Sequence, residues 1–329
     1  MAADAPLRFG AFAPQGWKLE YSGWDGRAAW ERTVELAQRA EDLGYDHLWV
    51  YDHVETVPRR EPTHVFEAFT TLAALSQQTR TVRLGQLVSC AAYRNAGLLA
   101  KEAAGIDVMS GGRLILGLGA GWYQREYEAY GWRFPPPRER LEILEETLAV
   151  VRGLWTQDAV SFAGRHLHLD GAYCDPKPLQ SLPEIWVGGS GERVTLRLAA
   201  AHADKTNWQV GLDAFVHKSA VLRRHCEDIG RGFDTIVRTH APDCRIFDDD
   251  AALRSWLDAP DGGHLWGSAD PASYVRDNFV GTVETVTDKV QAYIDAGARE
   301  FVLWFRDFPE PKSLERFATE VVPKVSGVA

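Results

Sequence analysis

Short apolar runs alternate with amphipathic stretches along nearly the whole chain. The apolar runs are typical of buried strands, and they cover residues 7–12, 46–51, 82–88, 113–118, 183–187, 204–208, 235–240 and 301–304. Each run precedes a stretch whose apolar residues are spaced three or four apart, which predicts a helix. These stretches cover residues 27–43, 65–76, 96–109, 138–154, 192–202, 213–229, 283–296 and 311–322.

Eight strands that each lead into a helix predict an α/β protein of the (β/α)8, or TIM, barrel type. Right-handed crossovers between parallel strands close such a repeat most naturally into a barrel. An open doubly wound sheet with a cap is the structural alternative, but the chain has no dinucleotide-binding fingerprint. We therefore expect residues 1–329 to form one barrel domain. It would carry one insertion near 156–182, with a hairpin or long loop, and an irregular one near 241–280.

Charge and composition narrow the class of protein. The 36 basic and 46 acidic residues give a net charge of −10, which disfavours a nucleic-acid or anionic-membrane binder. No apolar run approaches the roughly 20 residues that span a bilayer, and residues 1–6 contain no apolar segment typical of a secretory signal. The four cysteines form no closely spaced pair, and His166 and His168 have no further ligands beside them. These features predict a cytoplasmic protein without a metal site.

In a TIM barrel, functional residues lie where strands end and the following loops begin. Asp52 and His53 follow the second predicted strand, and a carboxylate beside an imidazole can exchange protons near neutral pH. The structural alternative is a polar loop start in which Asp52 caps a turn. After the third strand, Arg94 could bind an anion, although a structural ion pair is favoured. Cys90 shows no sign of activation as a nucleophile.

Glycines follow two further strands. Gly188, Gly189, Ser190 and Gly191 connect a strand to a helix expected from residue 192, and free amides at such a turn can hold a phosphate. A plain turn is the alternative interpretation. The glycines within 117–121 allow close backbone approach, and an aromatic residue follows them. Several tryptophans follow or end predicted strands and are expected to line an aromatic pocket, among them Trp17, Trp122 and Trp208.

At these segments the chain resembles the bacterial luciferase-like family, and within it the branch that uses the deazaflavin coenzyme F420. The strongest signal is the run S-G-G-R at 110–113 followed by G-L-G-A-G-W at 117–122. The resemblance covers nearly the whole chain and also includes residues 7–10, 51–53, 89–95, 99–101, 107–109, 126–127, 188–191 and 301–305.

The resemblance implies a cofactor at the C-terminal mouth of the barrel, and it implies that dimers are common. Asp52 would lie near the polar edge of the deazaflavin and His53 near its reactive centre. The residues that would back the ring or hold the cofactor phosphate are Leu87, Val88, Cys90, Gly188, Gly189 and Ser190. Relatives also carry a non-proline cis peptide that matches the Leu87–Val88 bond.

Two departures from the family pattern qualify the resemblance. Trp122 stands where deazaflavin sugar-phosphate dehydrogenases place a catalytic glutamate, which argues against oxidation of a sugar phosphate. Ala91 and Ala92 stand where relatives often have asparagine and a small residue, which affects the detailed ring contacts.

The sequence therefore predicts an F420-dependent oxidoreductase, assembled as a homodimer, that acts on a small organic molecule. His53 would handle the proton that accompanies hydride transfer. Reduction of an activated C=C or C=N bond is the favoured reaction. Two alternatives stay open: a monooxygenase that uses reduced FMN and oxygen, and a protein that binds a cofactor without catalysis.

Overall fold

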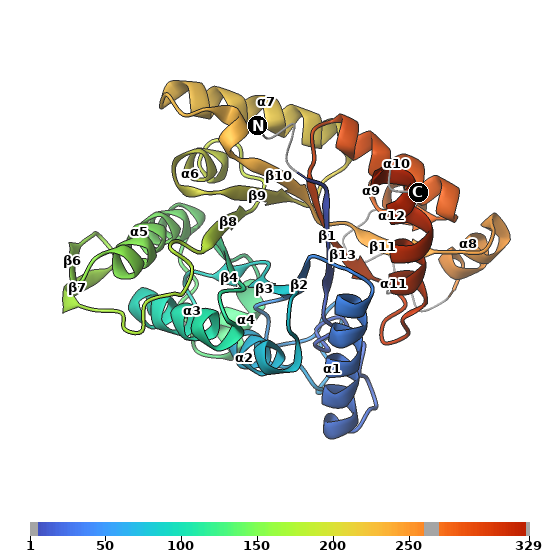
Figure 1. Ribbon diagram of the computed structural model, residues 1–329, viewed down its shortest axis with the longest axis horizontal. Coiled ribbons are helices and arrows are strands. Elements are labelled where there is room, and N and C mark those ends of the chain that lie inside the picture. Colours follow the sequence, from blue (N-terminus) through green and yellow to red (C-terminus); the bar gives the residue numbers. More distant parts are fainter. Residues whose placement is uncertain (1–5, 260–269, 327–329) are drawn as a thin grey trace.

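Eight parallel strands close into a barrel in the computed structural model, which describes residues 6–259 and 270–326 (Figure 1). The strands are β1 (Arg8–Phe12), β2 (His47–Val50), β3 (Arg83–Gln86), β5 (Leu114–Gly119), β8 (Glu184–Gly188), β9 (Lys205–Trp208), β10 (Val237–His240) and β13 (Glu300–Phe305). Pairing of β1 with β13, with Phe9 opposite Phe301, closes the ring. A two-residue strand, β4 (Ser89–Cys90), continues from β3 along β5. The predicted TIM barrel is confirmed.

Helices surround the barrel and pack their apolar faces on the outside of the strands (Figure 1). They are α1 (Gly26–Asp42), α2 (Ala68–Gln78), α3 (Ala96–Ser110), α4 (Gln124–Ala129), α5 (Pro137–Thr156), α6 (Thr195–His202), α7 (Leu212–Asp228), α10 (Val283–Asp295), α11 (Lys312–Arg316) and α12 (Val322–Ser326). A π-helical turn, Phe317–Val321, joins the last two. None of the described helices has the length and apolarity that a bilayer crossing requires.

Helix α6 begins at Thr195, whereas the sequence predicted a start at Glu192. Residues 192–194 form a turn instead. The reason is that contacts with α7 hold Glu192: its carbonyl oxygen accepts a hydrogen bond from His225 Nε2 at 2.8 Å, and its carboxylate accepts one from Lys218 at 3.2 Å.

The two predicted insertions lie outside the regular βα repeat and project at opposite sides of the view in Figure 1. Region 156–182 contains an antiparallel hairpin of β6 (Val160–Ala163) and β7 (His168–Ala172). Region 241–280 is not irregular, as the sequence suggested. Its described residues form parallel strands and two helices: β11 (Asp243–Ile246), α8 (Asp250–Leu257), α9 (Pro271–Asp277) and β12 (Phe279–Gly281). These strands are too short for their apolar pattern to be recognised. Their side chains Cys244, Ile246 and Phe279 join the main core, and Val280 forms a small second cluster with Phe247 and Tyr274.

Arg113, the last residue of the S-G-G-R run, connects elements of the fold. Its guanidinium donates hydrogen bonds to the carbonyl oxygens of Ser76, Thr79 and Val82, at 2.6–3.0 Å, and so joins the end of α2 to the start of β3. Gly111 ends α3 in the left-handed region, with φ of 73°. This run therefore serves the fold on the side of the barrel where the strands begin.

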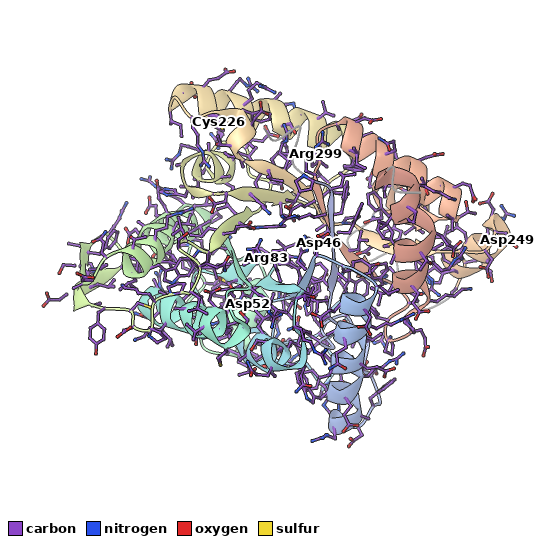
Figure 2. All side chains as sticks on the ribbon, viewed as in Figure 1. Asp46, Asp52, Arg83, Cys226, Asp249 and Arg299 are labelled. Atoms are coloured by element: carbon purple, nitrogen blue, oxygen red, sulfur yellow. The ribbon has the colours of Figure 1, made fainter. Side chains whose placement is uncertain are left out.

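A buried charge cluster forms the floor of the barrel, where several strands begin. Lys205 Nζ contacts Glu300 Oε1 at 2.5 Å and Glu184 Oε2 at 3.0 Å, and His47 Nε2 lies 3.4 Å from Glu300 Oε2. Arg83, labelled in Figure 2, extends the cluster through Glu184 at 2.8 Å. Burial alone would raise the pKa of Glu300, but the His47 ring and the charge of Lys205 lower it to about 2.

Replacement of Glu300 by glutamine should therefore destabilise the fold in a pH-dependent way. Because the folded-state pKa lies below the ordinary value of 4.5, the stabilisation is fully present above pH 4.5 and is lost as the pH falls towards 2. Glu300→Gln should lower the free energy of unfolding by about 3 kcal/mol at pH 7, and the difference should shrink at pH 3. Urea unfolding at both pH values measures this, with surface variant Glu31→Gln as control. A difference that does not change with pH would contradict the prediction.

Candidate active site

A cavity of about 390 Å³ opens among the C-terminal ends of the barrel strands and the loops that follow them. Its size is within the range of small-molecule and cofactor sites. Eleven of the twelve residues predicted for the site line it: Trp17, Asp52, His53, Leu87, Val88, Cys90, Trp122, Gly188, Gly189, Ser190 and Trp208. Gly191, the twelfth, comes directly after Ser190 but does not line the cavity.

His53 is held from two directions. Its Nδ1 donates a hydrogen bond to Glu126 Oε2 at 2.7 Å, and its ring stacks on Trp17 with 4.2 Å between centroids and 1° between planes. The T-shaped contact with Trp122, at 5.9 Å, flanks the ring further. Because Nδ1 is engaged, Nε2 is the nitrogen that a molecule in the cavity can meet.

Glu126, on α4, is completely buried and is the functional residue that sequence reasoning missed. Besides His53, it accepts hydrogen bonds from the backbone N–H groups of Val54 and Glu55, at 2.8 and 3.0 Å, and from Tyr93 Oη at 2.8 Å. Burial would raise its pKa, but the hydrogen bond and charge of His53 and the two backbone donors bring that pKa below its usual value. The family resemblance included residues 126–127, but it assigned Glu126 no role.

Asp52, labelled in Figure 2, is part of an ion-pair network. Arg94 grips both of its oxygens, at 2.6 and 2.8 Å, and the backbone N–H of Cys90 donates to Oδ2 at 2.8 Å. Arg94 also binds Glu67 at 2.8 Å and lies 3.7 Å from Glu102. The structural ion pair favoured for Arg94 is therefore confirmed, and it fixes the loop that carries Asp52 against β4.

Cys90 lines the cavity as a thiol. Burial raises its pKa to about 11, and its Sγ lies 2.9 Å from Tyr127 Oη in a hydrogen bond. Almost no thiolate exists near neutral pH, which agrees with the expectation that Cys90 is not a nucleophile.

One wall of the cavity is a bulge of backbone at the end of β3. The Leu87–Val88 peptide bond is cis, as the family resemblance implied. Glycines let neighbouring strands approach this bulge, because a Cβ on Gly119 or Gly188 would stand 2.5 or 2.6 Å from a Val88 methyl carbon. The result is a smooth apolar surface suited to a flat ring.

The loop after β8 presents backbone amides beside the cavity. Gly189 has φ of 122°, a conformation that L side chains rarely adopt. No described residue accepts a hydrogen bond from the backbone N–H of Ser190 or Gly191, and the ammonium of Lys218 fixes the Ser190 carbonyl oxygen at 2.8 Å. Two free amides beside a cation form a favourable environment for an anion. Within the described residues, no group of His, Cys, Asp and Glu side chains is arranged to hold a metal ion.

Comparison with known proteins places this geometry in context. The family model described as luciferase-like monooxygenase matches residues 7–300. An F420-dependent glucose-6-phosphate dehydrogenase of Gordonia bronchialis is 26% identical, covering 94% of this chain and 96% of its own. An FMNH(2)-dependent dimethylsulfone monooxygenase of Pseudomonas fluorescens is 27% identical, covering 88% and 86%. A solved F420-dependent secondary alcohol dehydrogenase, in complex with an F420-acetone adduct, superposes with a TM-score of 0.80 at 22% identity, covering 97% of this chain and 99% of that one.

The Arg94 network yields a stability prediction. Arg94→Met removes the cation that three carboxylates share, so we expect a loss of about 3–5 kcal/mol in the free energy of unfolding. Arg94→Lys keeps the charge but not the bidentate geometry. Its free energy of unfolding should therefore lie between those of Arg94→Met and the wild type. Urea unfolding measures both, with Arg138→Met, from an exposed ion pair, as control. A wild-type midpoint for Arg94→Met would show that the network does not support the fold.

Proposed function

Since the chain belongs to the luciferase-like monooxygenase family, we propose that it is an oxidoreductase that uses the deazaflavin coenzyme F420. The observation that carries the proposal is one cavity that joins the smooth Leu87–Val88 wall to an imidazole held by a buried carboxylate. The likeness to an F420-dependent dehydrogenase over 94% of the chain supports the choice of cofactor.

The residues present fit such a coenzyme. A Cβ on Gly119 or Gly188 would overlap the Val88 side chain, so these glycines let the apolar Leu87–Val88 wall stand where a flat ring can lie against it. The amides of Ser190 and Gly191, close to Lys218, suit the phosphate. Asp52, Leu87, Val88, Cys90, Gly188 and Gly189 are the further residues that would hold the group.

When bound, reduced F420 supplies a hydride. His53 Nε2 gives the accompanying proton to the substrate atom that does not receive the hydride, so an activated C=C or C=N bond gains two hydrogens and two electrons. Glu126 does not meet the substrate: it is a positioning residue that holds Nδ1 and stabilises the charged imidazole. Trp17 keeps the ring plane fixed by stacking. Trp122 and Trp208 contribute to the substrate side of the cavity.

The proposal extends to the protein's setting. We infer a cytoplasmic homodimer acting on a small molecule; the four free, buried cysteines suit a reducing compartment. The alternative of a monooxygenase is favoured by one observation, the comparable match to an FMNH(2)-dependent enzyme.

Reconstitution separates the two activities. We expect the purified protein to reduce an activated enone or imine without oxygen when reduced F420 is supplied, and to show no turnover with reduced FMN and oxygen. Loss of substrate and oxidation of the coenzyme, followed together, measure the reaction. Product formation that requires oxygen and reduced FMN would favour the monooxygenase instead.

Variants of His53 and Glu126 test their proposed roles as proton donor and positioning residue. His53→Ala should lower kcat by roughly 10²–10⁴, the usual contribution of a positioned acid or base, with little change in coenzyme affinity. Glu126→Gln removes the charge that stabilises imidazolium, so the pH–rate profile should move towards lower pH as well as falling in height. An unshifted profile for Glu126→Gln would leave Glu126 with a merely structural role, and full turnover by His53→Ala would exclude His53 as the proton donor.

Coenzyme binding should depend on the loop after β8. Gly189→Val places a branched side chain at φ of 122°, with its Cβ 3.2 Å from Thr195 Cγ2, so the amides should shift and F420 affinity should fall at least tenfold. The matched control is Gly131→Val, also at positive φ but in open space away from the cavity. Equilibrium titration with F420 measures both variants; equal affinities would remove this loop from the coenzyme site.

A further inference from the structure

We propose, on the basis of the F420-dependent function above, that the substrate is an uncharged, largely apolar molecule, because each charged side chain among the described residues that line the cavity is already paired within the chain. Both anionic substrates, such as sugar phosphates, and cationic ones are then selected against.

Three titratable acid or base side chains that can carry a formal charge near neutral pH line the cavity: Asp52, His53 and Asp243. The first is gripped by Arg94 at 2.6 Å, and the second is bonded to Glu126 at 2.7 Å. Asp243 accepts contacts from Lys18 Nζ at 3.3 Å and Tyr274 Oη at 2.8 Å.

A second cation lies near Asp243, since Arg306 Nη1 is 3.8 Å from its carboxylate. Lys18 is itself buried and belongs to an aromatic group at the cavity. Its Nζ lies 4.0 Å from the Trp304 ring centroid, 5.4 Å from that of Trp17 and 5.8 Å from that of Tyr51. Arg306 lies 4.4 Å from the same Trp304 ring. Three of the lining rings that could attract a cationic substrate, those of Trp304, Trp17 and Tyr51, therefore already lie near the protein's own cations.

No lysine or arginine is among the described residues that line the cavity. The described lining therefore offers an anionic substrate no ammonium or guanidinium group to pair with. A substrate phosphate or carboxylate would lose its water without gaining a charged partner.

What the lining offers instead is aromatic surface: Phe12, Trp17, Tyr51, Tyr93, Trp122, Tyr123, Trp208 and Trp304. Rings flank His53 on several sides, with Trp17 stacked on it and Trp122 and Tyr123 in T-shaped contact at 5.9 and 6.1 Å. Such a surface favours a flat apolar body, while Nε2 of His53 supplies the polar contact beside the reacting bond.

Three probes that share one skeleton test the proposal: 4-phenylbut-3-en-2-one, its para-carboxylate and its para-trimethylammonium derivative. Calorimetric titration of the protein, with and without F420, should give at least tenfold tighter binding of the neutral enone than of either charged form. Equal or tighter binding of a charged probe, or no binding of the neutral one, would overturn the proposal. F420-dependent turnover in the same samples is scored separately, so a failure of the coenzyme assignment is distinguishable from a failure of the substrate class.

An engineered cation provides the second arm. Gln209 lines the cavity and is exposed, so Gln209→Lys adds a charge without disturbing the core, and Gln209→Met is the uncharged control. Binding of the para-carboxylate should improve at least tenfold in Gln209→Lys relative to Gln209→Met, with no comparable gain for the neutral probe. No selective gain for the carboxylate would contradict the claim that a missing cation excludes anions.

Discussion

The hydrogen bond between His53 and the buried carboxylate of Glu126 is the interaction on which the site depends. It joins the loop after β2 to the helix after β5, two segments 73 residues apart in the sequence. The same carboxylate accepts the backbone N–H groups of Val54 and Glu55, so one side chain shapes the loop and orients the imidazole together. The His53 ring is thereby held in one orientation before any ligand enters the cavity, as the proposed proton transfer would require.

Charge compensation recurs from the floor of the barrel to its mouth. Lys205 is paired with Glu300 where the strands begin. At the opposite end of the barrel, Arg94 forms an ion pair with Asp52, and Lys18 forms one with Asp243. Pairing is what lets such groups remain buried in a closed barrel. The cavity is therefore bordered by charged side chains that already have partners, so its described lining offers no unpaired charge for a ligand to neutralise. The proposed selectivity then rests on the shape of the aromatic lining and on the polar contact that His53 offers.

Much of this could be predicted from the sequence, and the limits have physical causes. The barrel strands are buried on both faces and therefore show as continuous apolar runs, and the strand-end rule leads from them to the residues after β2, β3 and β8. The His53–Glu126 and Lys18–Asp243 pairs could not be predicted, because partners 73 and 225 residues apart leave no local pattern in the sequence. The elements of region 241–280 were missed for another reason, since strands as short as Phe279–Gly281 are shorter than any periodicity test resolves.

The proposed function requires that this cavity holds a deazaflavin and not a flavin mononucleotide. Parallel equilibrium titrations of the purified protein with F420 and with FMN, under the same conditions, distinguish the two coenzymes. We expect saturable binding of F420 at one site per chain and at least tenfold weaker binding of FMN. Saturable FMN binding without measurable F420 binding would show that the cavity is a flavin site instead.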